Sequence, residues 1–110
     1  APPDFREPIC AYLQREIAKP TVKNHGTQPA YRLSAALTVL DAWKNADDTP
    51  LLLEYLKHPL HYTQTQLEGD KRTEVRVYHF RTLARAMLEQ RGVKVPPGVV
   101  YEEEIGPGKE

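Results

Sequence analysis

The most constraining feature of the sequence is a set of apolar residues that recur at intervals of three and four. Leu33, Ala36, Leu37 and Leu40 lie at this spacing. The interval matches the 3.6-residue period of an α-helix and places these side chains on one face. A helix with such a face has to bury it against other elements. The sequence therefore predicts a helix over about residues 29–45, with the core of the protein built around it.

Two further segments are expected to be helices that pack against this one. Residues 7–18 carry apolar side chains at four-residue spacing, and a proline follows their end. Residues 50–58 begin with a proline, which suits the first turn of a helix, and contain three consecutive leucines. Asp47 and Asp48 precede this segment and offer side chains to cap it. The first sixty residues therefore predict a three-helix core.

Residues 60–80 are compatible with two structures. They are rich in Thr, Tyr, Val and Phe, and a Gly-Asp pair at 69–70 divides them. This pattern favours a β-hairpin, followed by a helix over residues 82–90 that ends at Gly92. Alternatively, Val75, Leu83 and Met87 fall on one face of a continuous helix over residues 70–91.

The predicted fold class is mainly α (α+β), with a three-helix core followed by a β-hairpin and a fourth helix. The alternative is an all-α bundle that contains the long helix 70–91. Residues 1–95 are expected to form a single globular helical domain, and residues 96–110 an extended segment with a loose acidic tail. No internal repeat is visible.

The cellular environment is constrained by what the sequence contains. The single cysteine, Cys10, excludes an internal disulfide and agrees with a reducing compartment. The first residues contain no basic segment followed by an apolar run, so we expect no signal peptide. The longest apolar stretches are far shorter than the ~20 residues that cross a bilayer. We therefore expect a soluble cytoplasmic protein with no membrane contact.

The net charge is zero, but the charges are unevenly distributed. Residues 71–94 carry seven positive and two negative side chains, whereas residues 41–70 carry two positive and six negative ones. Residues 95–110 have a net charge of −3. A basic block between two acidic ones is a candidate contact for phosphates. The candidate nucleic-acid-binding residues are Lys71, Arg72, Arg76, Arg81 and Arg85.

The order of three helices and a hairpin with basic residues at its tip resembles the winged-helix arrangement of many DNA-binding domains. The resemblance implies that residues 61–80 form the wing and that its basic side chains contact phosphates. The third helix does not match the recognition helix of that arrangement. It offers only Lys57 and His58 as donors, beside Glu54, whereas base edges are usually contacted by Arg, Asn or Gln.

No catalytic motif is present, so we expect no enzyme, no catalytic residue and no cofactor. The sequence lacks a phosphate-binding glycine loop, a dinucleotide-binding motif and a C-x-x-C motif. His58, His61 and His79 are weak metal candidates, because a hairpin would bring the last two close together. Pro59 interrupts the helix that would align the first two, so we expect structural histidines and no metal.

Apolar residues around the acidic turn point to a protein partner. A short helix cannot bury three consecutive leucines against one core, so one of them is expected to face outward. The candidate interface consists of Trp43, Leu51, Leu52 and Leu53. The function that we predict is therefore a non-enzymatic binding or assembly module that acts through protein–protein association, as a homodimer. The alternative is a nucleic-acid-binding protein that uses the basic segment 71–94.

Overall fold

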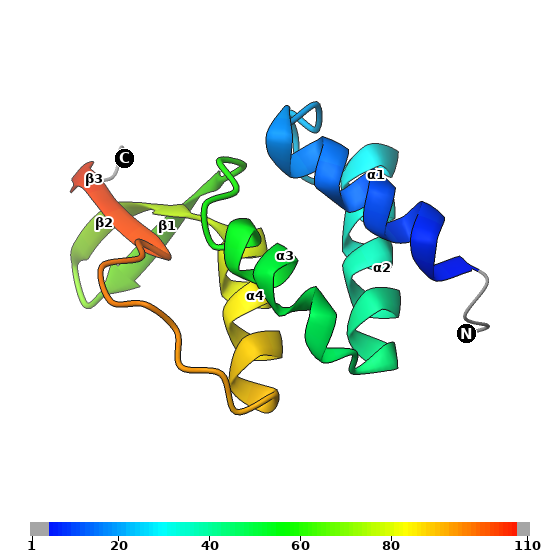
Figure 1. The fold of residues 1–110 in the computed structure, drawn as a ribbon. Helices are drawn as coiled ribbons and strands as arrows, with labels where there is room; N and C mark the ends of the chain where they lie inside the picture. Colours follow the sequence, from blue (N-terminus) through cyan, green and yellow to red (C-terminus); the bar gives the residue numbers. More distant parts are fainter. Residues whose placement is uncertain (1–4, 108–110) are drawn as a thin grey trace.

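The computed structural model describes residues 5–107 (Figure 1). Its elements in chain order are α1 (Arg6–Ala18), α2 (Gln28–Trp43), the 3-10 helix η2 (Ala46–Asp48), α3 (Thr49–Tyr55), β1 (Tyr62–Glu68), β2 (Lys71–Val77), α4 (His79–Gln90) and β3 (Glu102–Pro107). The predicted α+β class, with a helical core followed by a hairpin and a helix, is confirmed.

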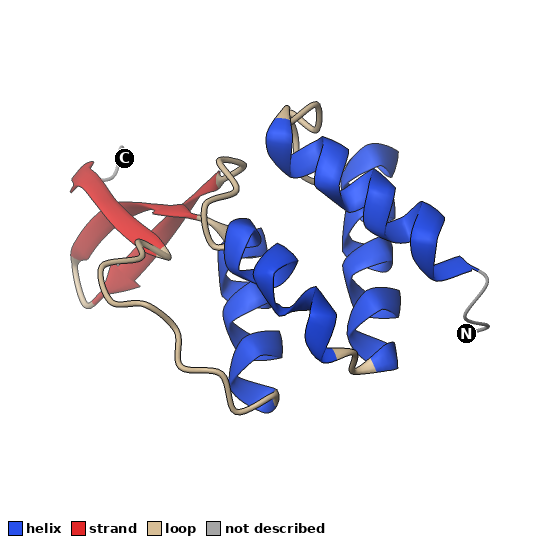
Figure 2. Cartoon of the chain, viewed as in Figure 1, coloured by secondary structure: helices blue, strands red, loops and turns tan. Residues whose placement is uncertain are grey.

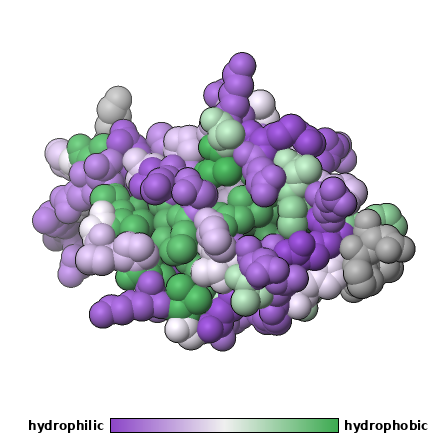
Figure 3. All heavy atoms as spheres, viewed as in Figure 1, coloured by the Kyte–Doolittle hydropathy of each residue, from purple (hydrophilic) through white to green (hydrophobic). Residues whose placement is uncertain are grey.

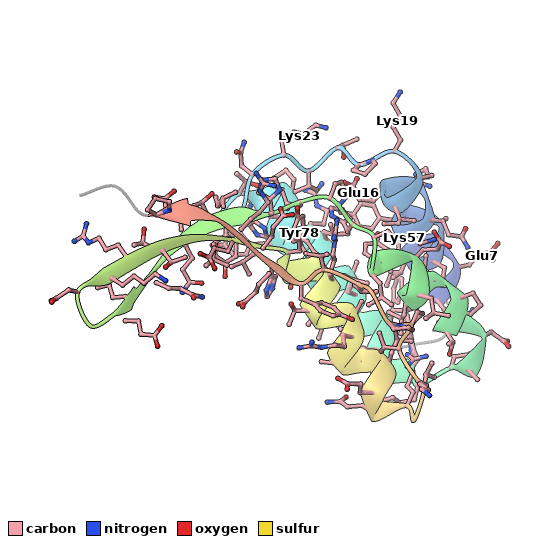
Figure 4. The ribbon with its side chains drawn as sticks, turned by 90° about the vertical axis from the view of Figure 1, so that its left-hand side faces the viewer. Glu7, Glu16, Lys19, Lys23, Lys57 and Tyr78 are labelled. Carbon is pink, nitrogen blue, oxygen red and sulfur yellow. The ribbon has the colours of Figure 1, made fainter. Side chains whose placement is uncertain are left out.

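The helices and the strands occupy opposite ends of the molecule (Figure 2). Helices α1 and α2 pack together at one end, and α3 joins them to α4 in the middle. The three antiparallel strands lie at the other end in the order β1-β2-β3. In Figure 4 the hairpin reaches well beyond the helices, and the molecule measures 52 × 30 × 22 Å. The sheet is thus attached to the helical core mainly by one end.

The core forms around the apolar face predicted for the second helix. Leu33, Leu37 and Leu40 are completely buried, together with Leu13 of α1 and Leu52 of α3. Apolar atoms remain visible in the middle of the face shown in Figure 3, where hydrophilic residues surround them. The periodicity of residues 33–40 therefore identified the centre of the fold correctly.

The turn before α3 is built differently from the prediction. Asp48 does not cap α3; its carboxylate is buried and forms an ion pair with Arg6 of α1. Asn45 caps the turn instead, because its side chain accepts a hydrogen bond from the Asp47 backbone N–H at 2.9 Å. The buried carboxylate thus ties the start of α1 to the start of α3, over 42 positions of sequence.

The hairpin is confirmed, and the alternative of a continuous helix over residues 70–91 is wrong. Strand β1 pairs with β2 from Tyr62↔Val77 to Glu68↔Lys71. Gly69 occupies the turn with φ +63°, a conformation that costs glycine little because it has no Cβ. A continuous helix over residues 70–91 would leave the strand residues 71–77 without their pairing to residues 62–68. The turn at residues 69–70 therefore favours the hairpin.

Helix α4 ends as the sequence predicted. Gly92 follows its last turn with φ +73°. The Val93 N–H donates to the Leu88 carbonyl, and the Gly92 N–H donates to the Glu89 carbonyl, each at 3.0 Å. This pair of bonds is the Schellman arrangement, which satisfies carbonyl groups that the helix leaves open.

The acidic segment near the C-terminus is not a loose tail within the described residues. Glu102–Pro107 forms β3, which pairs antiparallel with β2 through a bulge at Glu74/Val75. Residues 108–110 of the expected tail lie outside the described residues. Strand β2 is therefore the central strand, and the hairpin predicted from sequence is two thirds of a three-stranded sheet.

Replacement of Leu37 by Ala tests the core. Leu37 has no exposed surface, so Leu37→Ala should lower the free energy of unfolding by about 2–5 kcal/mol. The matched control is Leu67→Ala on β1, where the leucine is 66% exposed and the loss should be below about 0.5 kcal/mol. Denaturant unfolding followed by Trp43 fluorescence measures both. Equal losses at the two positions would contradict the assignment of the core.

Candidate functional site

The arginines of the basic segment contact other parts of the chain. Arg76 Nη1 donates to Glu103 Oε1 of β3 at 2.7 Å. Arg81 Nε donates to the carbonyl oxygen of His58 at 2.9 Å, and its Nη1 donates to the carbonyl oxygen of Val100 at 3.0 Å. Both side chains therefore link segments that are far apart in the sequence.

Arg85 also contacts other residues of the chain. Its guanidinium carbon lies 4.2 Å from the centre of the Tyr101 ring, and its Nε lies 3.8 Å from the Glu89 carboxylate. Lys71 and Arg72 are exposed at the tip of the hairpin. The five candidate nucleic-acid contacts thus do not form one cationic surface. They divide into a hairpin tip and a set of intramolecular anchors.

Further contacts hold the C-terminal segment against β2 and the end of α4 against the end of α2. The Tyr78 N–H donates to the Tyr101 carbonyl at 2.9 Å, which continues the β2–β3 pairing toward α4. Arg91, which is nearly buried, donates to the Asn45 carbonyl at 2.7 Å and lies 3.5 Å from the Asp41 carboxylate. Arg76 and Arg91 of the basic segment therefore pair with carboxylates from the two acidic parts of the sequence.

Helix α3 presents no basic surface where a winged-helix protein would read bases. Leu52 and Tyr55 are completely buried, and the Tyr55 hydroxyl donates to the Leu13 carbonyl at 2.7 Å. Glu54 and Lys57 approach each other to 3.8 Å on the outer side. The resemblance to winged-helix domains is therefore one of element order, and the groove-reading chemistry has no counterpart on α3.

His58, a candidate metal ligand, is a core residue. It has no exposed surface, and its ring stacks on Tyr55 and packs on Phe80 at centroid distances of 5.6 and 5.3 Å. Its Nδ1 accepts a hydrogen bond from the Leu60 N–H at 3.2 Å. Burial lowers the pKa of His58, and this effect outweighs the nearby Glu16 carboxylate, which acts in the opposite direction.

The other histidines gather in the same region. The His25 ring lies 5.7 Å from Phe80, 5.1 Å from Tyr62 and 5.9 Å from His79. His61 packs on a neighbouring tyrosine ring. Burial lowers the pKa of His25, and the adjacent His79 and His61 lower it further. Within residues 5–107, no group of three or more His, Cys, Asp or Glu side chains is arranged to hold a metal ion.

A hollow of about 600 Å³ lies beside the end of α1, and Glu16 lines it. The Glu16 carboxylate accepts bonds from the Thr21 N–H at 2.7 Å, the Thr21 hydroxyl at 2.6 Å and the Val22 N–H at 2.9 Å. Burial acts to raise its pKa, but these bonds outweigh that effect and lower it. In Figure 4 Lys19 and Lys23 point away from this carboxylate. Glu16 thus fastens the loop between α1 and α2.

Cys10 shows no sign of a reactive thiol. It is half-buried, with its Sγ 3.8 Å from the Asp48 carboxylate. Burial and the Asp48 charge both raise the pKa of the thiol, although Arg6 opposes them. A nucleophilic cysteine requires the opposite shift, toward the thiolate.

Of the four residues in the apolar interface predicted from sequence, one lies in the core. Leu52 is completely buried, and its place is therefore in the core rather than on an interface. Trp43, Leu51 and Leu53 are half-buried and pack against that core. Leu51 and Leu53 both keep part of their surface exposed on α3, which packs mainly against α4 and α1.

Exposed large apolar side chains occur on the sheet, and also at Phe5 and Tyr31 in the helical part. Leu67 and Tyr62 of β1 are 66% and 40% exposed, and Val100 and Ile105 are also exposed near and on β3. All seven residues of β1 have exposed side chains. In the described part of the chain, no strand pairs with the outer edge of β1. The alternation of Thr and Gln at 63–66 is the sequence signal for this edge, because neither face of the strand carries the apolar residues of a buried strand.

The two edges of the sheet differ in chemistry. The outer strand β3 carries three consecutive glutamates, a bulge and Pro107, which are features that discourage pairing with another strand. Strand β1 carries neither proline nor lysine nor arginine, and its first six residues are uncharged. Natural sheets usually protect their edges against pairing. In this sheet β3 is protected and β1 is open.

Comparison with protein-family models, curated proteins and solved structures finds no match. Of the described residues, none belongs to a helix with the length and apolar character needed to span a membrane. The interpretation of the site therefore depends on its own geometry.

Burial of His58 predicts that the protein becomes less stable as the pH is lowered. The pKa of His58 is lower in the folded protein than in the unfolded chain, where it is near 6.5. Above the unfolded pKa, neutral His58 therefore contributes fully to the free energy of unfolding, and this contribution is lost as the pH falls through the folded pKa. The melting temperature should thus decrease between about pH 7.5 and about pH 5. The decrease should be smaller in His58→Asn, which removes the titrating group, than in the exposed control His61→Asn. An equal decrease in His58→Asn would contradict this role.

Proposed function

We propose that this protein is a non-enzymatic association module that binds another protein chain by strand pairing at the open edge of β1. The observation that carries the proposal is the contrast between the two edges of the sheet. Strand β1 exposes seven largely uncharged residues, whereas β3 carries glutamates, a bulge and a proline. Strand addition to an exposed edge is a common mode of protein recognition.

The backbone groups available at this edge can be identified from the hairpin. Glu68 and Lys71 close a two-residue turn, and the closing pair of such a hairpin exchanges hydrogen bonds. Successive residues of a strand direct their backbone groups to opposite edges, so those of Glu68, Gln66 and Gln64 face β2. The backbone groups of Thr63, Thr65 and Leu67 therefore face outward, where a partner strand can bond to them.

Nucleic-acid binding is the weaker alternative. Arg76, Arg81 and Arg85 are engaged with β3, with backbone carbonyls and with an aromatic ring, so phosphate contacts would compete with these bonds. Affinity for duplex DNA depends on the number of phosphates neutralised, and it falls steeply with salt when that number is large. The arrangement of these arginines supports anchoring of the C-terminal segment instead.

Proline at position 65 tests the proposed edge. The N–H of Thr65 faces outward, so Thr65→Pro removes a donor from the edge while leaving the bonds to β2 in place. Peptides of about ten residues, selected from a displayed library for binding to the wild-type protein, should bind Thr65→Pro at least about tenfold more weakly. Fluorescence polarisation with the labelled peptides measures the change.

Two controls accompany this measurement. Thr65→Ser keeps the backbone N–H and should bind the selected peptides as the wild type does. The melting temperature of Thr65→Pro should show that the variant is folded. Peptides that bind all three proteins equally, or a library that yields no binder, would overturn the proposal.

A further inference from the structure

We infer that the strand bound by β1 is β1 of a second copy of this chain, paired antiparallel with Thr65 opposite Thr65 of the other copy. The inference rests on the proposed function, because it uses the same open edge. The resulting dimer contains one continuous six-stranded sheet with a twofold axis between the two β1 strands. Each copy contributes the order β1-β2-β3, so the two protected β3 strands lie at the outer edges.

This register uses every outward-facing backbone group of the strand. With Thr65 on the twofold axis, Thr63 of each copy lies opposite Leu67 of the other. The Thr65–Thr65 pair and the two Thr63–Leu67 pairs each exchange two hydrogen bonds, so the two strands form about six in total. A shift of the axis to Gln64 or Gln66 leaves one outward-facing residue of each copy without a partner.

The side chains are compatible with the same register. On one face the Thr65 hydroxyls meet, and each exposed Leu67 packs against Thr63 of the other copy. On the other face Gln64 lies opposite Gln66, and Glu68 lies opposite Tyr62. The two Glu68 carboxylates are thus kept at opposite ends of the strand pair. Like charges opposite one another would disfavour pairing, and this register contains no such pair among the β1 residues.

The dimer is expected to be weak and concentration-dependent. One pair of seven-residue strands buries less area than the roughly 1,200–2,000 Å² of a standard stable interface. The hairpin extends beyond the helices (Figure 4), so the helical cores of the two copies add little contact. We expect a dissociation constant in the micromolar range or above. Sedimentation equilibrium of the whole chain at rising concentration should show a monomer–dimer equilibrium that Thr65→Pro shifts at least about tenfold toward monomer.

Cysteine crosslinking tests the register. In a Cys10→Ser background, Thr65→Cys places two thiols opposite each other, with Cα atoms about 5.5 Å apart, a separation that a disulfide spans. Mild oxidation should therefore give a covalent dimer. Thr63→Cys alone and Leu67→Cys alone should not, because the axis separates each from its own copy by four residues, roughly 13 Å. A mixture of these two variants should form the disulfide-linked heterodimer.

The controls separate the possible failures. Ala35→Cys, exposed on α2, measures crosslinking by random collision. Crosslinking of Thr65→Cys no faster than Ala35→Cys, or a dimer that Thr65→Pro leaves unchanged, would overturn the inference. If the chain stays monomeric while selected peptides still bind β1 and are lost in Thr65→Pro, the second copy is excluded as partner but the proposed function stands. If those peptides also fail, both are overturned.

Discussion

The pairing of β3 with β2 determines which surface of this protein is open. Because the C-terminal segment joins β2 on the side away from β1, β2 becomes the central strand and β1 remains at an edge. The arginines fix this arrangement. Arg76 binds a β3 carboxylate, Arg81 holds the Val100 carbonyl, and Arg85 lies on the Tyr101 ring. A chain in which the acidic segment paired with β1 would have no open uncharged edge.

The elements formed by local interactions were predictable from the sequence. The leucine face of α2, the Gly69 turn and the Gly92 helix end follow from periodicity and backbone preference within about ten residues. Strand β3 was not predictable in the same way. Its glutamates have low strand propensity, and it is stabilised by β2, some thirty positions earlier in the chain. The role of Asp48 is not predictable for the same reason, because its partner Arg6 is remote in sequence.

The charge distribution shows why the candidate sites were harder to predict than the fold. A basic block next to an acidic one was interpreted as a surface for a charged ligand, but the two blocks lie beside each other in the folded chain. Surface pairs such as Arg76–Glu103 contribute little to stability, because water and salt screen their attraction. Their effect is on specificity: they favour β3 on the β2 side over other positions. Charge counting along a sequence does not distinguish such internal matching from an external site.

The protection of only one edge also limits how the protein can assemble. A sheet with two open edges adds further copies at both sides and grows into a fibre. Here the only open edge of the described sheet is β1, so a second copy that pairs with it through a twofold axis uses up both open edges. The β3 strands, with their glutamates and Pro107, then terminate the six-stranded sheet of the proposed dimer on both sides. In the proposed dimer the acidic segment thus has two roles: it completes the sheet of each copy and ends the paired sheet.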